Sequence, residues 1–424
     1  MKLNPGRRSC WTSRHVVRTF CVTSSSDAKR QRRLSVCRRA DIVVPVLVIG
    51  VCAANLCRGY YWMHHQHHQD QREQQQLPLQ RHALGQESMP RLVDLIDGCH
   101  VRADANVSWL LDFAIIGFPK CGTTSIMRSL QAHSNVGMFD DERCDNSYNH
   151  QGRLVRDLLY LQQQRQQQQH NVLPHPIIRL GLKCPADLEN TALALPAYKR
   201  YFPHTKLLVG IRHPVLWFES FYNHRVHNKF PMPPPARLVG KCRKGMFNVC
   251  TARARFHVFL ANLGKTSLSN PVELGLLGSA ATALHPVPTT APVFLYEVSQ
   301  LADDENAERQ AQFLYDLQAF LDLPQHLNGL QWHKPGMAYE SERARQAAEK
   351  RKMDICHDQY ASLRAILMTH AVNASAWIAQ YFVAATGVTV SSRDYFVNTI
   401  LPRWKVDPCN QRNKTAAVVV APAG

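Results

Sequence analysis

Two glycines frame a loop whose residue types suit the binding of an anion. Residues 115–125 read IIGFPKCGTTS, an apolar run followed by the loop between Gly117 and Gly122. Glycine lets the backbone turn tightly, and a helix that begins near Thr123 directs unpaired N–H groups and its positive dipole end toward the loop. The spacing therefore predicts a phosphate or sulfate site at the end of a strand.

The lysine of this loop differs in position from that of nucleotide-binding P-loops. An ATP or GTP loop reads G-x-x-x-x-G-K-[ST], with lysine directly after the second glycine. Here Thr123 and Thr124 follow Gly122, and Lys120 lies inside the loop. A P-loop nucleotide kinase or NTPase stays an alternative, and it predicts Mg²⁺-dependent ATP turnover. The displaced lysine argues against it.

The sequence from Pro119 to Thr124 resembles the 5′-phosphosulfate loop of sulfotransferases that use 3′-phosphoadenosine 5′-phosphosulfate (PAPS). The resemblance implies that Lys120 lies against the oxygen that bridges phosphate and sulfate. It also implies that small side chains, hydroxyls and amides of the same loop hold the 5′-phosphate. The donor-binding residues would then be Lys120, Cys121, Gly122, Thr123, Thr124 and Ser125.

A second segment resembles the part of a PAPS site that binds the 3′-phosphate. Residues 206–222 read KLLVGIRHPVLWFESFY, an apolar run with Arg212 at its end and Ser220 eight positions later. The family has an arginine at a strand end and a serine at this spacing, in this order after the first loop. The resemblance therefore implies that Arg212 and Ser220 hold the 3′-phosphate.

Sulfuryl transfer to an alcohol needs alignment, a base for the acceptor proton, and positive charge near the leaving phosphate. Related carbohydrate sulfotransferases carry a glutamate beyond the helix after the loop, which makes Glu142 the first choice of base; Asp140 and Asp141 stay alternatives. The stretch Gly181 to Pro185 resembles a lysine-x-proline motif of these enzymes. Lys183 is therefore a candidate for stabilising sulfuryl oxygens or orienting the acceptor.

The chain pattern predicts an α/β fold, a P-loop-like, mostly parallel sheet flanked by helices. Strand-like runs occur at 113–116, 177–182, 207–211 and 293–296, and both donor motifs follow such runs. Open α/β sheets bind ligands at the carboxyl ends of their strands. A helix is expected after Asp303, running to Leu321, and a further pair of helices is expected between Asp354 and Phe382. We expect a single sulfotransferase domain over 101–410.

The N-terminal region predicts a membrane anchor. Residues 1–40 hold eleven Lys or Arg and one acid, so 11 − 1 = +10 of the net +18, and 42–57 is uncharged. Sixteen residues are short for a bilayer, but Tyr60-Tyr61-Trp62 extend the segment. We expect a cytoplasmic tail (1–41), an anchor (42–62), a flexible His/Gln-rich stem (63–100) and a disordered C-terminal tail (411–424). A cleaved signal or an organelle transit peptide are the alternatives for 42–62.

The cysteines and sequons fit an oxidising compartment. Eight cysteines follow residue 58, and among their pairings we favour Cys242 with Cys250 and, second, Cys356 with Cys409. Asn106, Asn373 and Asn413 stand in N-x-[ST] sequons, which matter only if the domain is lumenal.

These observations together predict a Golgi, single-pass type II enzyme with a lumenal catalytic domain. It would transfer a sulfuryl group from PAPS to a hydroxyl or amine of a carbohydrate, with no metal required. Neither zinc-ligand spacing nor an aromatic-interleaved basic stripe suggests nucleic acid as a partner. A sulfotransferase-like lectin without activity is a further alternative, and the acceptor and oligomeric state stay open.

Overall fold

The computed structural model describes residues 90–169, 179–264, 291–303, 306–324, 326–327, 329–330 and 342–410. The predicted basic tail, the anchor at 42–62, the stem up to residue 89 and the C-terminal tail at 411–424 lie outside these residues. In the part of the chain that is described, every helix is too short or too polar to cross a membrane.

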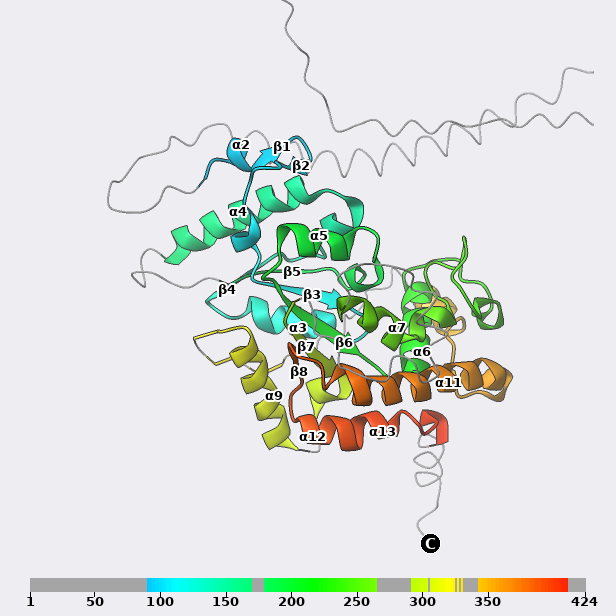
Figure 1. The fold of residues 1–424 in the computed structure, drawn as a ribbon. Coiled ribbons are helices and arrows are strands. Elements are labelled where there is room, and N and C mark those ends of the chain that lie inside the picture. Colours follow the sequence, from blue (N-terminus) through cyan, green and yellow to red (C-terminus); the bar gives the residue numbers. More distant parts are fainter. Residues whose placement is uncertain are drawn as a thin grey trace, which may run out of the picture. The chain divides into compact units, whose positions relative to one another are not determined.

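Six parallel strands form the central sheet, as the sequence predicts (Figure 1). Their spatial order is β4, β5, β3, β6, β7, β8, so both donor motifs follow strands in the middle of the sheet. The bounds are β3 (Phe113–Gly117), β4 (Val136–Met138), β5 (Arg179–Lys183), β6 (Lys206–Ile211), β7 (Val293–Glu297) and β8 (Val388–Thr389). All pairings are parallel.

The apolar runs become strands because a parallel sheet is covered on both faces. All five residues of β3 and of β7 are buried. Strand β5 (Arg179–Lys183) ends one residue later than the predicted run at 177–182, and residues 177 and 178 lie outside the described residues. Strands β4 and β8 were not predicted, because three and two residues are too few to show a pattern.

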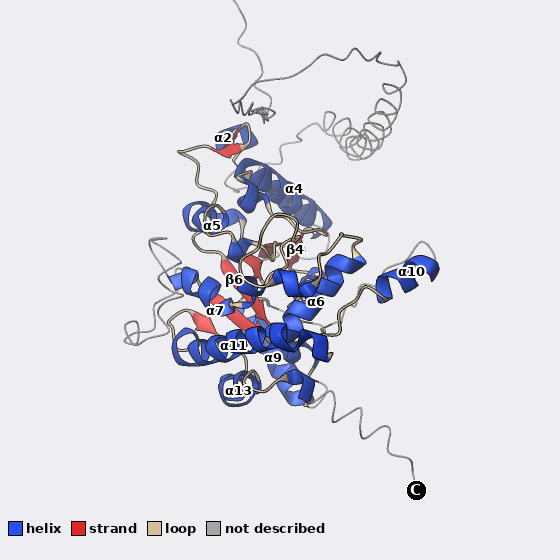
Figure 2. Ribbon diagram, turned by 90° about the vertical axis from the view of Figure 1, so that its right-hand side faces the viewer, coloured by secondary structure: helices blue, strands red, loops and turns tan. Residues whose placement is uncertain are grey.

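Helices flank the sheet. Helix α3 (Thr123–Gln131) and helix α9 (Ala307–Phe320) pack on one face, where Ile126, Leu130, Phe313 and Leu317 contact the same core as Phe113. Helix α11 (Ala361–Trp377) packs against α6 (Pro214–His227) and α7 (Phe256–Leu260) (Figure 2). The other α-helices are α2 (Leu92–Leu95), α4 (Gln151–Gln169), α5 (Ala194–Tyr201), α10 (Glu342–Glu349), α12 (Arg393–Tyr395) and α13 (Leu401–Arg403).

Two details correct the sequence reading. The expected pair of helices between Asp354 and Phe382 is one helix, because α11 continues into a π-helical turn at Ile378–Phe382. Residues 92–101, which we placed in the stem up to residue 100, form α2 and a small hairpin, β1 (Ile96–Asp97) with β2 (His100–Val101). The hairpin lies on α4, where the Gly152 amide donates to the Cys99 carbonyl at 2.9 Å. The hairpin is therefore part of the folded domain.

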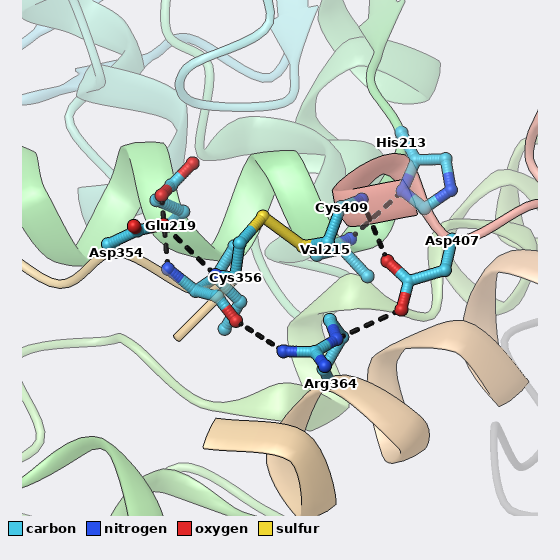
Figure 3. The surroundings of a disulfide bond; sticks show 9 residues. His213, Val215, Glu219, Asp354, Cys356, Arg364, Asp407 and Cys409 are labelled. Atoms are coloured by element: carbon cyan, nitrogen blue, oxygen red, sulfur yellow. Dashed lines mark hydrogen bonds and ion pairs between the residues drawn. A yellow bond between two sulfur atoms is a disulfide. The ribbon is translucent and has the colours of Figure 1, made fainter. Parts of the chain in front are cut away.

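A disulfide braces the C-terminal segment against the start of α6 (Figure 3). The Cys356–Cys409 bond joins two segments that Arg364 also bridges, through Asp407 at 2.9 Å and the Ile355 carbonyl at 2.8 Å. The Ile355 amide in turn donates to Glu219 of α6 at 3.1 Å. Both predicted pairings, this one and Cys242–Cys250, are confirmed, and a third, Cys144–Cys184, was not predicted.

Candidate active site

The loop after β3 has the backbone of an anion cradle. Gly122 takes a left-handed φ of 74° and caps α3, and Lys120 takes a φ of 67°. A left-handed lysine is uncommon and marks strain of the kind that concentrates at functional loops. A Cβ on Gly122 would lie 2.1 Å from Leu301 Cδ1, so this position also needs glycine for space. Helix α3 begins at Thr123, so the positive end of its dipole lies at the loop.

The β6–α6 unit is joined to that loop by a hydrogen bond. The indole of Trp217, on α6, donates to the Pro119 carbonyl at 2.8 Å, and the Phe118 amide donates to the Gly210 carbonyl at 3.0 Å. Arg212 follows β6 directly, and His213 caps α6 by accepting from the Val215 amide at 3.2 Å. The two predicted donor motifs are therefore neighbours at the carboxyl edge of the sheet.

Three cations share this edge. Burial lowers the pKa of Lys120, and the nearby charges of Arg212 and Lys183 lower it further. The Nε atom of Arg212 is buried and has no hydrogen-bond partner among the described residues. Positive charges that face one another in a partly buried site are stabilised by an anion between them. The site therefore favours a ligand with negative charge near both Lys120 and Arg212.

Lys183 links the donor loop to the acidic segment. Its side chain is buried, and Nζ donates to Thr124 Oγ1 at 2.9 Å and pairs with Glu142 Oε1 at 2.9 Å. Glu142 keeps a side-chain exposure of 55%, so its carboxylate is open to an incoming group. Asp140 instead accepts from Gln131 at 3.3 Å, and Asp141 is exposed. Of the three acids, Glu142 is the one that the structure places at Lys183.

The Cys144–Cys184 disulfide fixes this arrangement. Its two cysteines follow Glu142 by two residues and Lys183 by one, with Cα atoms 5.1 Å apart. The Arg143 amide also donates to the Lys183 carbonyl at 2.8 Å. The acidic segment is thus joined covalently to the end of β5. Ligand atoms of Cys144, Cys184 and Asp187 lie within 4.8 Å of one another, but the disulfide leaves neither sulfur as a thiolate for a metal.

Of the remaining predicted residues, Cys121, Thr123 and Ser125 lie in the loop or in the first turn of α3. Cys121 is fully buried, and burial raises the pKa of its thiol well above the ordinary value, which disfavours the thiolate. Thr123 and Ser125 are buried in the first turn of α3. Ser220 is half-buried on α6, three residues after Trp217.

Comparisons with known proteins give only weak structural likenesses. No model of a protein family matches the chain, and no curated protein matches its sequence. A solved sulfotransferase from Alicyclobacillus acidocaldarius matches with 15% identity, covering 63% of this chain and 95% of its own, at a TM-score of 0.36. At this identity and score the likeness carries no information about the chemistry of the site.

Sequence reasoning missed Trp217 and His224, which lie on the face of α6 toward the donor loop. They are seven residues apart, which places them two turns apart on one helical face. Burial, then the charges of Lys120, Arg225, His227 and Lys183, lower the pKa of His224 to about 4, so the ring is neutral at neutral pH. In the sequence, the only sign of Trp217 and His224 is a ring nitrogen on a helical face that is otherwise apolar.

Asp187, just beyond Lys183, predicts a pH-dependent stability. It is fully buried and accepts from Ser147 at 2.6 Å and Tyr198 at 2.8 Å, and burial raises its pKa from 3.8 to about 6. Because the folded-state pKa is raised, its stabilising contribution is complete below pH 3.8 and is lost as the pH rises through 6. We expect Asp187 to lower the free energy of unfolding by about 3 kcal/mol over that range.

The measurement is urea unfolding of the full chain and of Asp187→Asn from about pH 4 to about pH 7. The variant should lose this part of the pH dependence. A difference between the two proteins that does not change with pH would rule out this account of Asp187.

Proposed function

We propose that the chain is a PAPS-dependent sulfotransferase that acts on a carbohydrate. The observation that carries the proposal is the convergence of Lys120 and Arg212 on one sheet edge, with the buried Nε of Arg212 lacking a partner among the described residues. A donor with a phosphosulfate at one end and a 3′-phosphate at the other would place negative charge at both residues. The glycine cradle at Gly122 suits the close approach of the phosphosulfate.

In this proposal the acceptor oxygen attacks sulfur in line with the leaving phosphate oxygen. The sulfur–oxygen bond to the phosphate breaks as the new bond forms, and Glu142 takes the acceptor proton. Lys120 stabilises the charge that develops on the phosphate. Lys183 positions Glu142 through their ion pair, and it positions Thr124 through a hydrogen bond. The lumenal, type II membrane location remains part of the proposal.

Recognition of the 3′-phosphate gives the most direct test. We expect Arg212→Gln to weaken binding of 3′-phosphoadenosine 5′-phosphate by at least about tenfold while leaving binding of adenosine 5′-phosphate nearly unchanged, because only the former has a phosphate at Arg212. Calorimetric titration of the full chain measures both. Arg156→Gln, an exposed arginine on α4, is the matched control.

Two results would overturn the proposal. One is equal affinity of the wild-type chain for the two nucleotides, and the other is the absence of transfer of radiolabelled sulfur from PAPS to every glycan of a broad panel. Mg²⁺-dependent ATP hydrolysis would instead favour the nucleotide kinase or NTPase alternative. Binding of the bisphosphate without any transfer would favour the lectin alternative.

A further inference from the structure

The positive charge of the folded region is concentrated in one segment. Residues 212–264 contain nine Lys or Arg and a single acid, Glu219, which gives 9 − 1 = +8. Residues 41–424 as a whole carry 18 − 10 = +8. Charges in the rest of that region therefore cancel, and its excess lies in the segment that contains Arg212, α6 and the loop closed by Cys242–Cys250.

Arg225, on α6, is a positive charge of this segment that forms no ion pair with a carboxylate of the described residues. Its guanidinium carbon lies 5.1 Å from the ring centroid of Phe221 and 5.1 Å from that of Phe230. Its Nε is buried without a hydrogen-bond partner, and among the described residues no acid is within ion-pair distance of it. Two aromatic contacts thus hold the charged guanidinium in place without a hydrogen-bond partner for its Nε.

Arg253, which packs on the same aromatic ring as Arg225, is by contrast neutralised by a carboxylate. It also packs over Phe221, at 4.8 Å, but its guanidinium pairs with the buried carboxylate of Glu189 at 2.5 Å. Both side chains of that pair are largely buried. Among the described residues, one arginine on Phe221 therefore has a carboxylate partner and the other has none, which leaves Arg225 available to an external anion.

Arg225 is on the acceptor side of the site. The charges of Arg253 and of Glu142 both act on the Arg225 guanidinium, which places it within electrostatic range of the proposed base. The preceding residue, His224, is within range of Lys120 and Lys183. The C-terminal half of α6 thus runs past Glu142, whereas Arg212, before its N-terminus, belongs to the donor end.

A basic loop extends this surface. The ring of Phe230, which holds Arg225, lies 5.1 Å from that of Phe247 in the loop closed by the Cys242–Cys250 disulfide. That loop exposes Arg243 and Lys244, and Lys241 is exposed directly before it. Arg351, which follows α10, donates to the Phe230 carbonyl at 2.7 Å. Phe230 is therefore the centre of a surface lined by positive charge.

We propose that Arg225 binds a carboxylate or sulfate group of an acidic saccharide, and that the loop at 241–244 extends this acceptor site. The planar guanidinium can donate two parallel hydrogen bonds to either group. This inference rests on the proposed function, since it names the acceptor class of the same site. It is tested with heparin oligosaccharides and with the same oligosaccharides after desulfation and carboxyl reduction.

We expect Arg225→Gln to raise the KM for the charged oligosaccharides by about tenfold, with kcat and the KM for PAPS nearly unchanged. The KM for the neutral oligosaccharides should not change. Arg225→Lys keeps the charge but not the fork, so it should recover only part of the affinity. Arg156→Gln should behave as wild type, and thermal unfolding checks that each variant is folded.

Equilibrium binding of the charged oligosaccharides at physiological salt separates failure of this inference from failure of the proposed function. If 3′-phosphoadenosine 5′-phosphate does not bind but Arg225→Gln alone loses oligosaccharide affinity, the anion site stands and the sulfotransferase proposal falls. If the nucleotide binds but Arg225→Gln and Arg156→Gln bind the charged oligosaccharides equally, the acceptor inference is overturned. A wild-type preference for the neutral oligosaccharides would overturn it as well.

Discussion

Replacing Lys120 by alanine should lower the rate of sulfuryl transfer by about 10³-fold. In the proposed mechanism the leaving phosphate gains negative charge as the bond to sulfur breaks, and Lys120 is the cation of the loop that stabilises it. The loop should survive the change, because its shape depends on Gly122 and on the Trp217 bond to the Pro119 carbonyl. The loss corresponds to about 4 kcal/mol of transition-state stabilisation.

The measurement is single-turnover transfer from radiolabelled PAPS by the full chain, with binding of 3′-phosphoadenosine 5′-phosphate recorded in parallel. Lys405→Ala, an exposed lysine near the C-terminal end of the domain, is the matched control. Because burial and neighbouring cations lower the pKa of Lys120, removing this charge should not lower the free energy of unfolding. Transfer within about tenfold of wild type would show that Lys120 has no role at the bond being broken.

Replacing Glu142 by glutamine should lower kcat by about 10²- to 10⁴-fold, because an amide cannot accept the acceptor's proton. Glutamine still accepts a hydrogen bond from Lys183, so the variant tests proton transfer with the local fold preserved. Steady-state kinetics with saturating PAPS give the comparison.

The two neighbouring acids provide internal controls. Asp140→Asn and Asp141→Asn should retain most of the activity, since Asp140 contacts Gln131 and Asp141 is exposed, whereas Glu142 is paired with Lys183. A larger loss in Asp141→Asn than in Glu142→Gln would transfer the proposed role of base to Asp141. Equal, small losses in all three variants would mean that none of the three acids takes the proton.

The sequence was sufficient for the elements whose signal is local. The buried runs of β3, β6 and β7 are continuous and apolar, and the two glycines of the loop after β3 are visible in the sequence. Lys120 and Arg212 could be placed at one edge because parallel strands end at the same side of a sheet. The fold class and the proximity of the two donor motifs were therefore predictable.

The contacts that complete the site depend on residues far apart in the chain, and no local pattern carries them. Cys144 and Cys184 are 40 residues apart, among many possible pairings. The Trp217 bond to Pro119 spans 98 residues, and Arg253 finds Glu189 across 64. An arginine with a partner and one without look the same in sequence, so only the structure distinguishes Arg253 from Arg225.

The Cys144–Cys184 disulfide divides the site into two parts that can be lost separately. The glycine loop and Arg212 are positioned by the sheet and by hydrogen bonds, and they do not depend on the oxidation state of these cysteines. Glu142 depends on it, since without the disulfide its segment would be held by the Arg143 amide and an ion pair that is half open to water. A chain produced under reducing conditions is therefore expected to bind nucleotide normally, whereas Glu142 is no longer held at the proposed reacting centre. A measurement of nucleotide binding alone would then overestimate the fraction of the protein that can catalyse transfer.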